Sequence, residues 1–68
     1  MDNSITKRRK AHKLTQEELA KLTAVTRQTI IAIENNKYDP SLSLAFKLAE
    51  VLDTTVDDLF KKDGEQDV

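Results

Sequence analysis

The chain contains no cysteine, and it has only one glycine, one proline and one histidine among its 68 residues. Without cysteine there can be no disulfide, no thiolate zinc site and no thiol nucleophile. Proteins of reducing compartments rarely contain disulfides, and a chain without cysteine fits such a compartment. The sequence therefore predicts a cytoplasmic protein. Glycine and proline mark the turns of sheets and hairpins. Because both are scarce here, the boundaries of the secondary-structure elements must be inferred from helix caps and hydrophobic spacing.

Long apolar runs and catalytic constellations are missing as well. The longest apolar run covers residues 30–33, whereas a membrane-spanning helix needs about 20 residues, and the N-terminus shows no signal-peptide pattern. His12 has no serine or carboxylate at triad-like spacing and is expected at the surface. Asp57, Asp58 and Asp63 lack the glycine and the spacing of a calcium loop. The sequence predicts no membrane contact, no metal or other cofactor, and no enzymatic activity.

The charge is distributed unevenly along the chain, although the net charge is only −1. Residues 1–37 hold eight Lys/Arg against four acidic residues, which leaves +4. Residues 38–68 hold three lysines against eight acidic residues, which leaves −5. The basic half can face phosphates while the acidic half faces away or toward a partner. Solvated charges on ordinary helices would give the same pattern, so charge alone does not decide between them.

Caps and hydrophobic spacing predict five short helices, and no segment sustains the period-two alternation of a strand. The first helix covers about residues 3–12, with Ile5 as its apolar anchor. Thr15 and Glu18 form a capping box, which starts a second helix that runs over residues 16–23. Three apolar positions of this second helix are expected on one stripe, namely Leu19, Ala20 and Leu22.

The remaining three helices follow from similar signals. Thr26 caps a third helix that ends at about residue 34, and residues 35–40 turn the chain because asparagine tolerates left-handed angles and proline holds its predecessor extended. Ser41 caps a fourth helix, and Thr55 caps a short fifth one. The expected inward positions are Ile30, Ile33, Leu44, Ala45, Leu48, Ala49, Val51, Leu52, Leu59 and Phe60. The sequence thus predicts an all-α domain over residues 1–62 and a disordered polar tail over residues 63–68.

Four spaced segments carry a recognisable pattern, namely Leu14–Ala20, Val25–Ile30, Ile33–Asn35 and Pro40–Leu42. Together they resemble the lambda repressor-like helix-turn-helix family, in particular its Cro and XRE-type regulators, and the likeness covers about residues 5–60. The resemblance implies a compact five-helix bundle whose second and third helices bind DNA. It further implies a transcriptional regulator, expected to be a repressor, that acts as a homodimer on a palindromic operator in double-stranded DNA.

The third helix is the expected recognition helix. Eight residues of α-helix are about 12 Å long, which matches the width of the major groove of B-DNA. Four side chains are expected on the face opposite its inward isoleucines: Arg27, Gln28, Ile31 and Ala32. Arg27 is expected to donate two hydrogen bonds to guanine, or else to contact a phosphate, and Gln28 either pairs with adenine or binds a phosphate. Ala32 offers at most a methyl contact with thymine, and Ile31 forms either such a contact or an apolar patch.

The resemblance implies further DNA contacts outside that face. Gln16 is expected to touch a phosphate and to brace Arg27, and Thr29 matches a position that often binds the DNA backbone. Residues 36–37 match a loop that grips the next phosphates, and Tyr38 either adds its hydroxyl there or packs over the loop. The predicted DNA-binding residues are Gln16, Thr26, Arg27, Gln28, Thr29, Ala32, Asn36, Lys37 and Tyr38.

Other matched positions have structural roles. Arg9 and Glu34 match a family pair, which implies a partly buried salt bridge. Ala24 stands where the family usually has glycine, so we expect a left-handed residue there that costs roughly 1 kcal/mol. Lys13 likewise replaces a frequent glycine at the end of the first helix. A surface cluster of solvated charges is expected from Arg8, Lys10 and Lys13.

The acidic second half keeps an alternative open. The chain would then be an antitoxin-like interaction module that binds a partner protein and autoregulates, which is compatible with DNA binding. Dimerisation is a separate expectation, since so small a core can leave part of an apolar C-terminal set uncovered. That set consists of Val51, Val56, Leu59 and Phe60. A two-fold dimer would place its half-sites roughly 34 Å apart.

Overall fold

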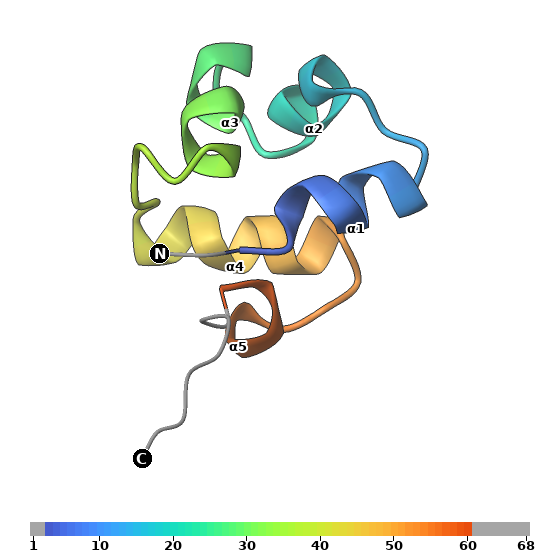
Figure 1. The fold of residues 1–68 in the computed structure, drawn as a ribbon, viewed down its shortest axis with the longest axis vertical. Coiled ribbons are helices and arrows are strands. Elements are labelled where there is room, and N and C mark those ends of the chain that lie inside the picture. Colours follow the sequence, from blue (N-terminus) through green and yellow to red (C-terminus); the bar gives the residue numbers. More distant parts are fainter. Residues whose placement is uncertain (1–2, 61–68) are drawn as a thin grey trace.

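The structure, a computed structural model, describes residues 3–60. Within that range the chain forms five α-helices and no strand, so the prediction of an all-α fold is confirmed. The helices are α1 (Ile5–Ala11), α2 (Gln16–Leu22), α3 (Arg27–Glu34), α4 (Leu42–Val51) and α5 (Val56–Leu59). Figure 1 shows α2 and α3 together on one side of α1 and α4, with α5 on the opposite side of α4. The predicted domain end at residue 62 and the predicted tail lie outside the described residues.

Hydroxyl side chains begin four of the five helices. In each, the N-cap hydroxyl accepts a hydrogen bond from the backbone N–H three residues later, at 3.0–3.2 Å. These N-caps are Thr15, Thr26, Ser41 and Thr55. The Glu18 carboxylate also accepts from the Thr15 backbone N–H at 2.8 Å, which completes the predicted capping box. Each cap satisfies an otherwise unpaired donor and typically contributes about 1 kcal/mol.

The first helix is tied to the last one. The Ser4 backbone N–H donates to the Leu59 carbonyl at 2.8 Å, and the Ser4 hydroxyl lies 3.3 Å from the Asp58 carbonyl. His12, at the other end of α1, is exposed as predicted, but its Nε2 lies 3.0 Å from the Leu52 carbonyl that ends α4. These contacts close the chain into one bundle.

Apolar side chains from all five helices meet in a single core. Seven of them are at most 1% exposed: Ile5, Leu19, Ile30, Ile33, Leu48, Leu52 and Leu59. Burial of each such side chain stabilises the fold by about 1.5 to 3 kcal/mol relative to exposure. Of the C-terminal set expected to stay partly uncovered, Leu59 is therefore fully buried. Val51, Val56 and Phe60 are half-buried and pack against the core.

The predicted apolar stripe of α2 is wrong for Leu22. Its side chain is 58% exposed, whereas Thr23 is only 1% exposed. At 100° per residue, Thr23 falls between Leu19 and Ala20 on the helix surface, while Leu22 lies about 160° from Ala20. Thr23 tolerates this burial because its hydroxyl donates to the Leu19 carbonyl at 2.8 Å.

The helices α1 to α4 each end in the same left-handed turn, and in none of them is the left-handed residue a glycine. The residue after each C-cap has a φ of 56–61°, and the next backbone N–H donates to the carbonyl five residues back at 2.8–3.0 Å. The left-handed residues are Lys13, Ala24, Asn36 and Asp53. This is the Schellman arrangement, in which the last carbonyls of a helix find donors. The predicted left-handed Ala24 is confirmed.

Replacing Ala24 by glycine is expected to raise the free energy of unfolding by about 0.5 to 1 kcal/mol. Left-handed alanine costs roughly 1 to 2 kcal/mol, and glycine removes this cost. Part of the resulting gain in stability is offset, because glycine has greater conformational freedom in the unfolded chain. Urea denaturation of the variant checks this. Asp53→Gly is the matched control, with a smaller gain because aspartate tolerates left-handed angles. An equal or larger gain at Asp53 would contradict the expectation.

Candidate nucleic-acid interface

Helices α2 and α3 form a compact corner. They pack against each other, and residues 23–26 connect them (Figure 1). The left-handed Ala24 and the half-buried Val25 make the turn. The buried Ile30 and Ile33 fix the inner face of α3 in the core, so its outer face is held on a rigid support.

The outer face of α3 carries the side chains that the sequence assigned to it. Arg27 and Gln28 are exposed in the first turn, and Ile31 and Ala32 are half-buried further along. The Thr26 hydroxyl caps the helix and lies 3.0 Å from the hydroxyl of Thr29. The first turn of α3 therefore presents a guanidinium and an amide to any ligand that approaches the helix.

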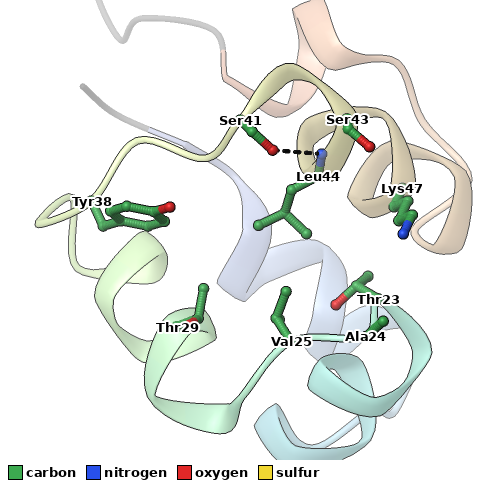
Figure 2. A pocket seen from close by; sticks show the side chains of 9 residues that line it. All are labelled: Thr23, Ala24, Val25, Thr29, Tyr38, Ser41, Ser43, Leu44 and Lys47. Carbon is green, nitrogen blue, oxygen red and sulfur yellow. Dashed lines mark hydrogen bonds between the residues drawn. The ribbon is translucent and has the colours of Figure 1, made fainter.

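The loop after α3 adds a second exposed group beside this face. Asn36, Lys37 and Tyr38 are all exposed. Figure 2 shows Tyr38 at one edge of a cavity of about 300 Å³ between α3 and the start of α4. The hydroxyl of Tyr38 is directed into this cavity, toward Ser41 and Leu44.

Gln16 and Arg27 line one hollow of about 430 Å³, together with Arg9, Thr15 and Glu17. The Gln16 amide donates to the Glu34 carboxylate at 3.0 Å, and within residues 3–60 no hydrogen bond joins it to Arg27. The Gln16 Nε2 therefore braces Glu34 in this structure. Its Oε1 can still accept from a guanidinium, so the brace on Arg27 stays a prediction.

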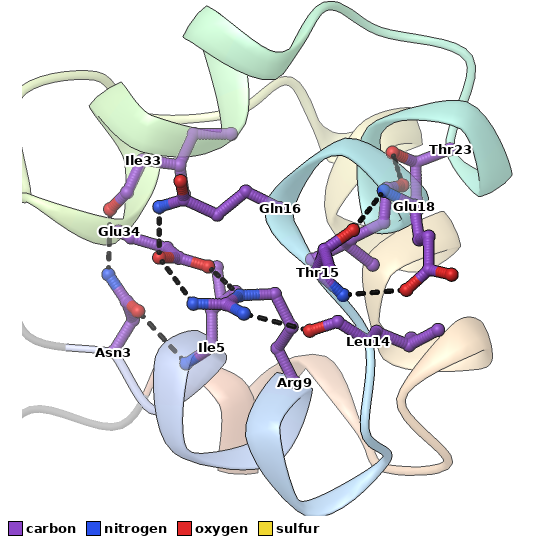
Figure 3. A network of polar contacts seen from close by, with 11 residues as sticks. Asn3, Ile5, Arg9, Leu14, Thr15, Gln16, Glu18, Thr23, Ile33 and Glu34 are labelled. Carbon is purple, nitrogen blue, oxygen red and sulfur yellow. Dashed lines mark hydrogen bonds and ion pairs between the residues drawn. The ribbon is translucent and has the colours of Figure 1, made fainter.

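A buried ion pair joins α1 to the end of α3, as the sequence predicted (Figure 3). Arg9 Nε donates to Glu34 Oε2 at 2.7 Å, and the two side chains are only 10% and 5% exposed. Arg9 Nη1 also donates to the Leu14 carbonyl at 2.8 Å. Arg9 thus links α1, the Leu14 segment and the end of α3, and Glu34 also accepts a hydrogen bond from Gln16 of α2.

The Glu34 carboxylate is held in its charged form. Burial by itself raises the pKa of this group. Hydrogen bonds from Arg9, Gln16 and Thr6, together with the positive charge of Arg9, outweigh that effect and leave the pKa below its ordinary value of 4.5. The network of Figure 3 therefore stabilises the ionised state of Glu34 in the folded protein.

Asn3 clamps the end of α3 to the start of α1, a role that sequence reasoning missed. Its Nδ2 donates to the Ile33 carbonyl and to Asn36 Oδ1, both at 2.9 Å, and its Oδ1 accepts from the Ile5 backbone N–H at 3.0 Å. Because Asn3 takes up the Oδ1 of Asn36, the NH₂ group of Asn36 is left for other acceptors. The sequence showed Asn3 only as a helix start, since its partners are 30 and 33 residues away.

The predicted cluster of solvated basic residues is smaller than expected. Lys10 and Lys13 are exposed, but Arg8 is half-buried. Its Nε donates to the Ser4 hydroxyl at 3.0 Å. Arg8 and Ser4 are four positions apart in the sequence, so one helical turn brings their side chains together.

Residues 3–60 were also compared with the requirements of a membrane-spanning helix and of a metal site. No helix in this range is long and apolar enough to cross a bilayer. Nor does the range contain a group of three or more histidine, aspartate or glutamate side chains that could hold a metal ion.

The family profile of helix-turn-helix proteins matches residues 5–59. The chain belongs to the Cro/XRE-type helix-turn-helix family. This family is one of DNA-binding transcriptional regulators rather than of enzymes. In its terms, α2 and α3 are the two helices of the motif, and the left-handed Ala24 lies in the turn between them.

Relatives of this helix-turn-helix chain occur in archaea and bacteria. An HTH-type transcriptional regulator of Methanocaldococcus jannaschii is 55% identical over 60 residues, which is 88% of this chain and 91% of that protein. The HTH-type transcriptional regulator YgzD of Bacillus subtilis is 38% identical over 60 residues, with the same two shares.

Solved helix-turn-helix structures share the fold. A chain of the SinR protein/SinI protein complex is 31% identical and superimposes with a TM-score of 0.80, over 90% of this chain and 60% of that one. The clp gene regulator ClgR of Corynebacterium glutamicum is 22% identical, with a TM-score of 0.76 over 81% of this chain and 58% of that one, and supports the fold alone. The present chain thus spans about three fifths of each solved chain.

Proposed function

We propose that the chain regulates transcription by laying α3 into the major groove of duplex DNA and reading base edges with Arg27 and Gln28. The observation that carries this proposal is the division of α3 into two faces. Ile30 and Ile33 lock one face into the core, while Arg27 and Gln28 stand exposed at the N-terminus of the other. An eight-residue helix held in this way fits one groove.

Phosphate contacts would come from both sides of α3. Gln16 lies at the start of α2 beside Arg27, and Lys37 is exposed in the loop that follows α3. Asn36 would donate from its NH₂ group, since a phosphate oxygen accepts hydrogen bonds, while its Oδ1 accepts from Asn3. Thr26 and Thr29 carry hydroxyls at the N-terminus of α3, where the helix dipole favours an anion. Such contacts position a protein on DNA, whereas contacts to base edges specify sequence.

The proposal also includes the oligomeric state, the kind of operator and the cellular location. We expect a homodimer that represses transcription from a palindromic operator in the cytoplasm. In the C-terminal set predicted for the dimer contact, Leu59 is fully buried and the other three members are half-buried against the core. Leu42 and Phe46, one turn apart on α4, are 67% and 58% exposed and offer more apolar surface. Sedimentation that shows a monomer at high micromolar concentration would contradict a stable dimer and leave DNA binding untouched.

The antitoxin-like alternative is less well supported. The acidic second half of the chain suggested it, but the matched family and the curated relatives are transcriptional regulators. SinR is found in a complex with the SinI protein, so a protein partner in addition to DNA is compatible with this fold. Co-purification of a stable companion protein from the native host would support the alternative.

Titration with a duplex of random sequence at low salt, followed by the backbone amide signals, tests the proposal. We expect the signals of residues 26–29 and 36–37 to move, whereas those of α5 stay in place. The affinity should fall steeply with salt, because phosphate contacts release counterions. If the signals of Arg27 and Gln28 do not move at low ionic strength, the proposed function is wrong.

A further inference from the structure

The side-chain amide of Asn3 is held in one orientation by two backbone groups. Its Nδ2 donates to the Ile33 carbonyl at 2.9 Å, and its Oδ1 accepts from the Ile5 backbone N–H at 3.0 Å (Figure 3). A carbonyl oxygen only accepts and a backbone N–H only donates, so a reversed amide would lose both hydrogen bonds. Asn3 therefore keeps its NH₂ group on the side of α3, at the point where that helix ends.

The fixed amide of Asn3 determines the orientation of a second amide. One hydrogen of the Asn3 NH₂ group is donated to Ile33, and the other is donated to Asn36 Oδ1, also at 2.9 Å. If the Asn36 amide were reversed, two NH₂ groups would face each other without an acceptor between them. Asn36 therefore turns its oxygen toward Asn3 and its own NH₂ group away from Asn3.

The backbone of Asn36 is fixed as well. Its φ is 60° in the left-handed turn after α3, and its backbone N–H donates to the Ile33 carbonyl at 3.0 Å. The residue is exposed, and the proposed function places it on a phosphate. Because the oxygens of a phosphodiester only accept hydrogen bonds, the NH₂ end of Asn36 is the end that suits them. The free protein thus already holds Asn36 in the orientation that a phosphate requires.

We propose that Asn3 is a positioning residue for DNA binding, which acts through Asn36 by directing the NH₂ group of Asn36 to a backbone phosphate. The inference rests on the proposed function and extends it to a residue outside the helix-turn-helix motif. An interface side chain that is already held loses less rotamer freedom on binding, which corresponds to about two- to tenfold in affinity. Asn3 itself need not touch the DNA.

Two substitutions isolate this contact. Asn3→Ser keeps a hydroxyl that can accept from the Ile5 backbone N–H, but serine is too short to reach Asn36. The Ile33 carbonyl still accepts from the Asn36 backbone N–H in this variant, so it should fold. Asn36→Gly removes the side chain, and glycine adopts the left-handed backbone without strain.

Fluorescence anisotropy at one fixed salt concentration measures the effect on a random duplex and on an operator selected from a pool of random duplexes. Both duplexes should lose alike, because a phosphate contact carries no sequence information. Asn36→Gly should weaken binding about tenfold, the loss expected for one hydrogen bond to a charged group. Asn3→Ser should weaken binding about threefold. In the Asn36→Gly background Asn3→Ser should have no further effect, because the residue through which it acts is gone.

The salt dependence distinguishes this contact from an ionic one. Asparagine is neutral and releases no counterion from DNA, so both variants should keep the wild-type dependence of affinity on salt. Lys37→Ala is the control, since the loss of a cation should reduce that slope by about one unit. Urea denaturation at the same temperature checks that each variant is folded. A merely structural role of Asn3 would lower the free energy of unfolding and leave the affinity of the folded protein unchanged.

The failure of this inference and that of the proposed function are distinguishable. If the wild type binds neither duplex, the proposed function is wrong, and this inference is lost with it. If Asn36→Gly binds like the wild type while the amide signals of Arg27 and Gln28 still move, DNA binding stands and the inference is overturned. It is also overturned if Asn3→Ser leaves the affinity unchanged, or if it weakens binding equally in the wild-type and Asn36→Gly backgrounds.

Discussion

Replacing Glu34 by alanine is expected to lower the free energy of unfolding by about 3 to 5 kcal/mol. The substitution leaves Arg9 charged inside the fold, where its side chain is only 10% exposed and retains the Leu14 carbonyl as its other acceptor. An unpaired buried charge carries a penalty of this size. Domains are stable by only about 5 to 15 kcal/mol in total. Urea denaturation at neutral pH should therefore show a much lower midpoint with an unchanged slope.

A double variant distinguishes the cost of leaving Arg9 unpaired from the net contribution of the Arg9–Glu34 ion pair to stability. Arg9→Met combined with Glu34→Leu removes both charges and fills the space with apolar groups. Exchanges of this kind are often neutral or stabilising, so the double variant should recover most of the stability lost in Glu34→Ala. A cost below about 1 kcal/mol for Glu34→Ala alone would mean that the pair behaves like an exposed surface bridge.

The same network makes the contribution of Glu34 depend on pH. Its pKa is lower in the folded protein than the ordinary value of 4.5. A depressed carboxyl pKa stabilises the fold above the unfolded pKa, and this stabilisation is lost as the pH falls through the folded value. The difference in unfolding free energy between the wild type and Glu34→Gln should be largest near neutrality and should shrink below about pH 4.5. A difference that stays constant from pH 7 to pH 3 would contradict this assignment.

The fold was predictable because its signals are local. An N-cap hydroxyl and its N–H partner are three residues apart, so Thr15, Thr26, Ser41 and Thr55 mark helix starts in the sequence itself. The left-handed turn at Ala24 followed from the helix-turn-helix resemblance. The prediction was wrong for Leu22 because an apolar stripe leaves out Thr23, whose hydroxyl finds its acceptor within its own helix.

The exposure of the predicted site residues on α3 could be predicted from the sequence, whereas their contacts within the protein could not. That Arg27 and Gln28 stand exposed on α3 follows from their position opposite the isoleucines. The partners of Gln16 and Asn3 could not be deduced, because Gln16 binds Glu34 across 18 residues and Asn3 binds Asn36 across 33. Contacts of that separation depend on how the helices pack, which a single sequence does not encode in any local pattern.

Replacing Arg27 by alanine is expected to weaken binding to the selected operator by about 1 to 3 kcal/mol and to relax the preference at one base pair. The guanidinium is exposed in the first turn of α3, where it can donate two parallel hydrogen bonds to guanine. Affinity for random duplex should change much less. Fluorescence anisotropy on both duplexes at one fixed salt concentration measures the two losses.

Lys37→Ala is the matched control, because it removes an exposed cation from the loop instead of from the helix. It should weaken all duplexes alike and reduce the salt slope by about one unit. Arg27→Lys makes the distinction sharper, since lysine keeps the charge but lacks the planar fork. If Arg27 reads guanine, the lysine variant should lose preference at that base pair while its affinity for random duplex stays near that of the wild type. If Arg27 instead holds a phosphate, lysine should substitute for it on every sequence, and alanine should weaken operator and random duplex equally.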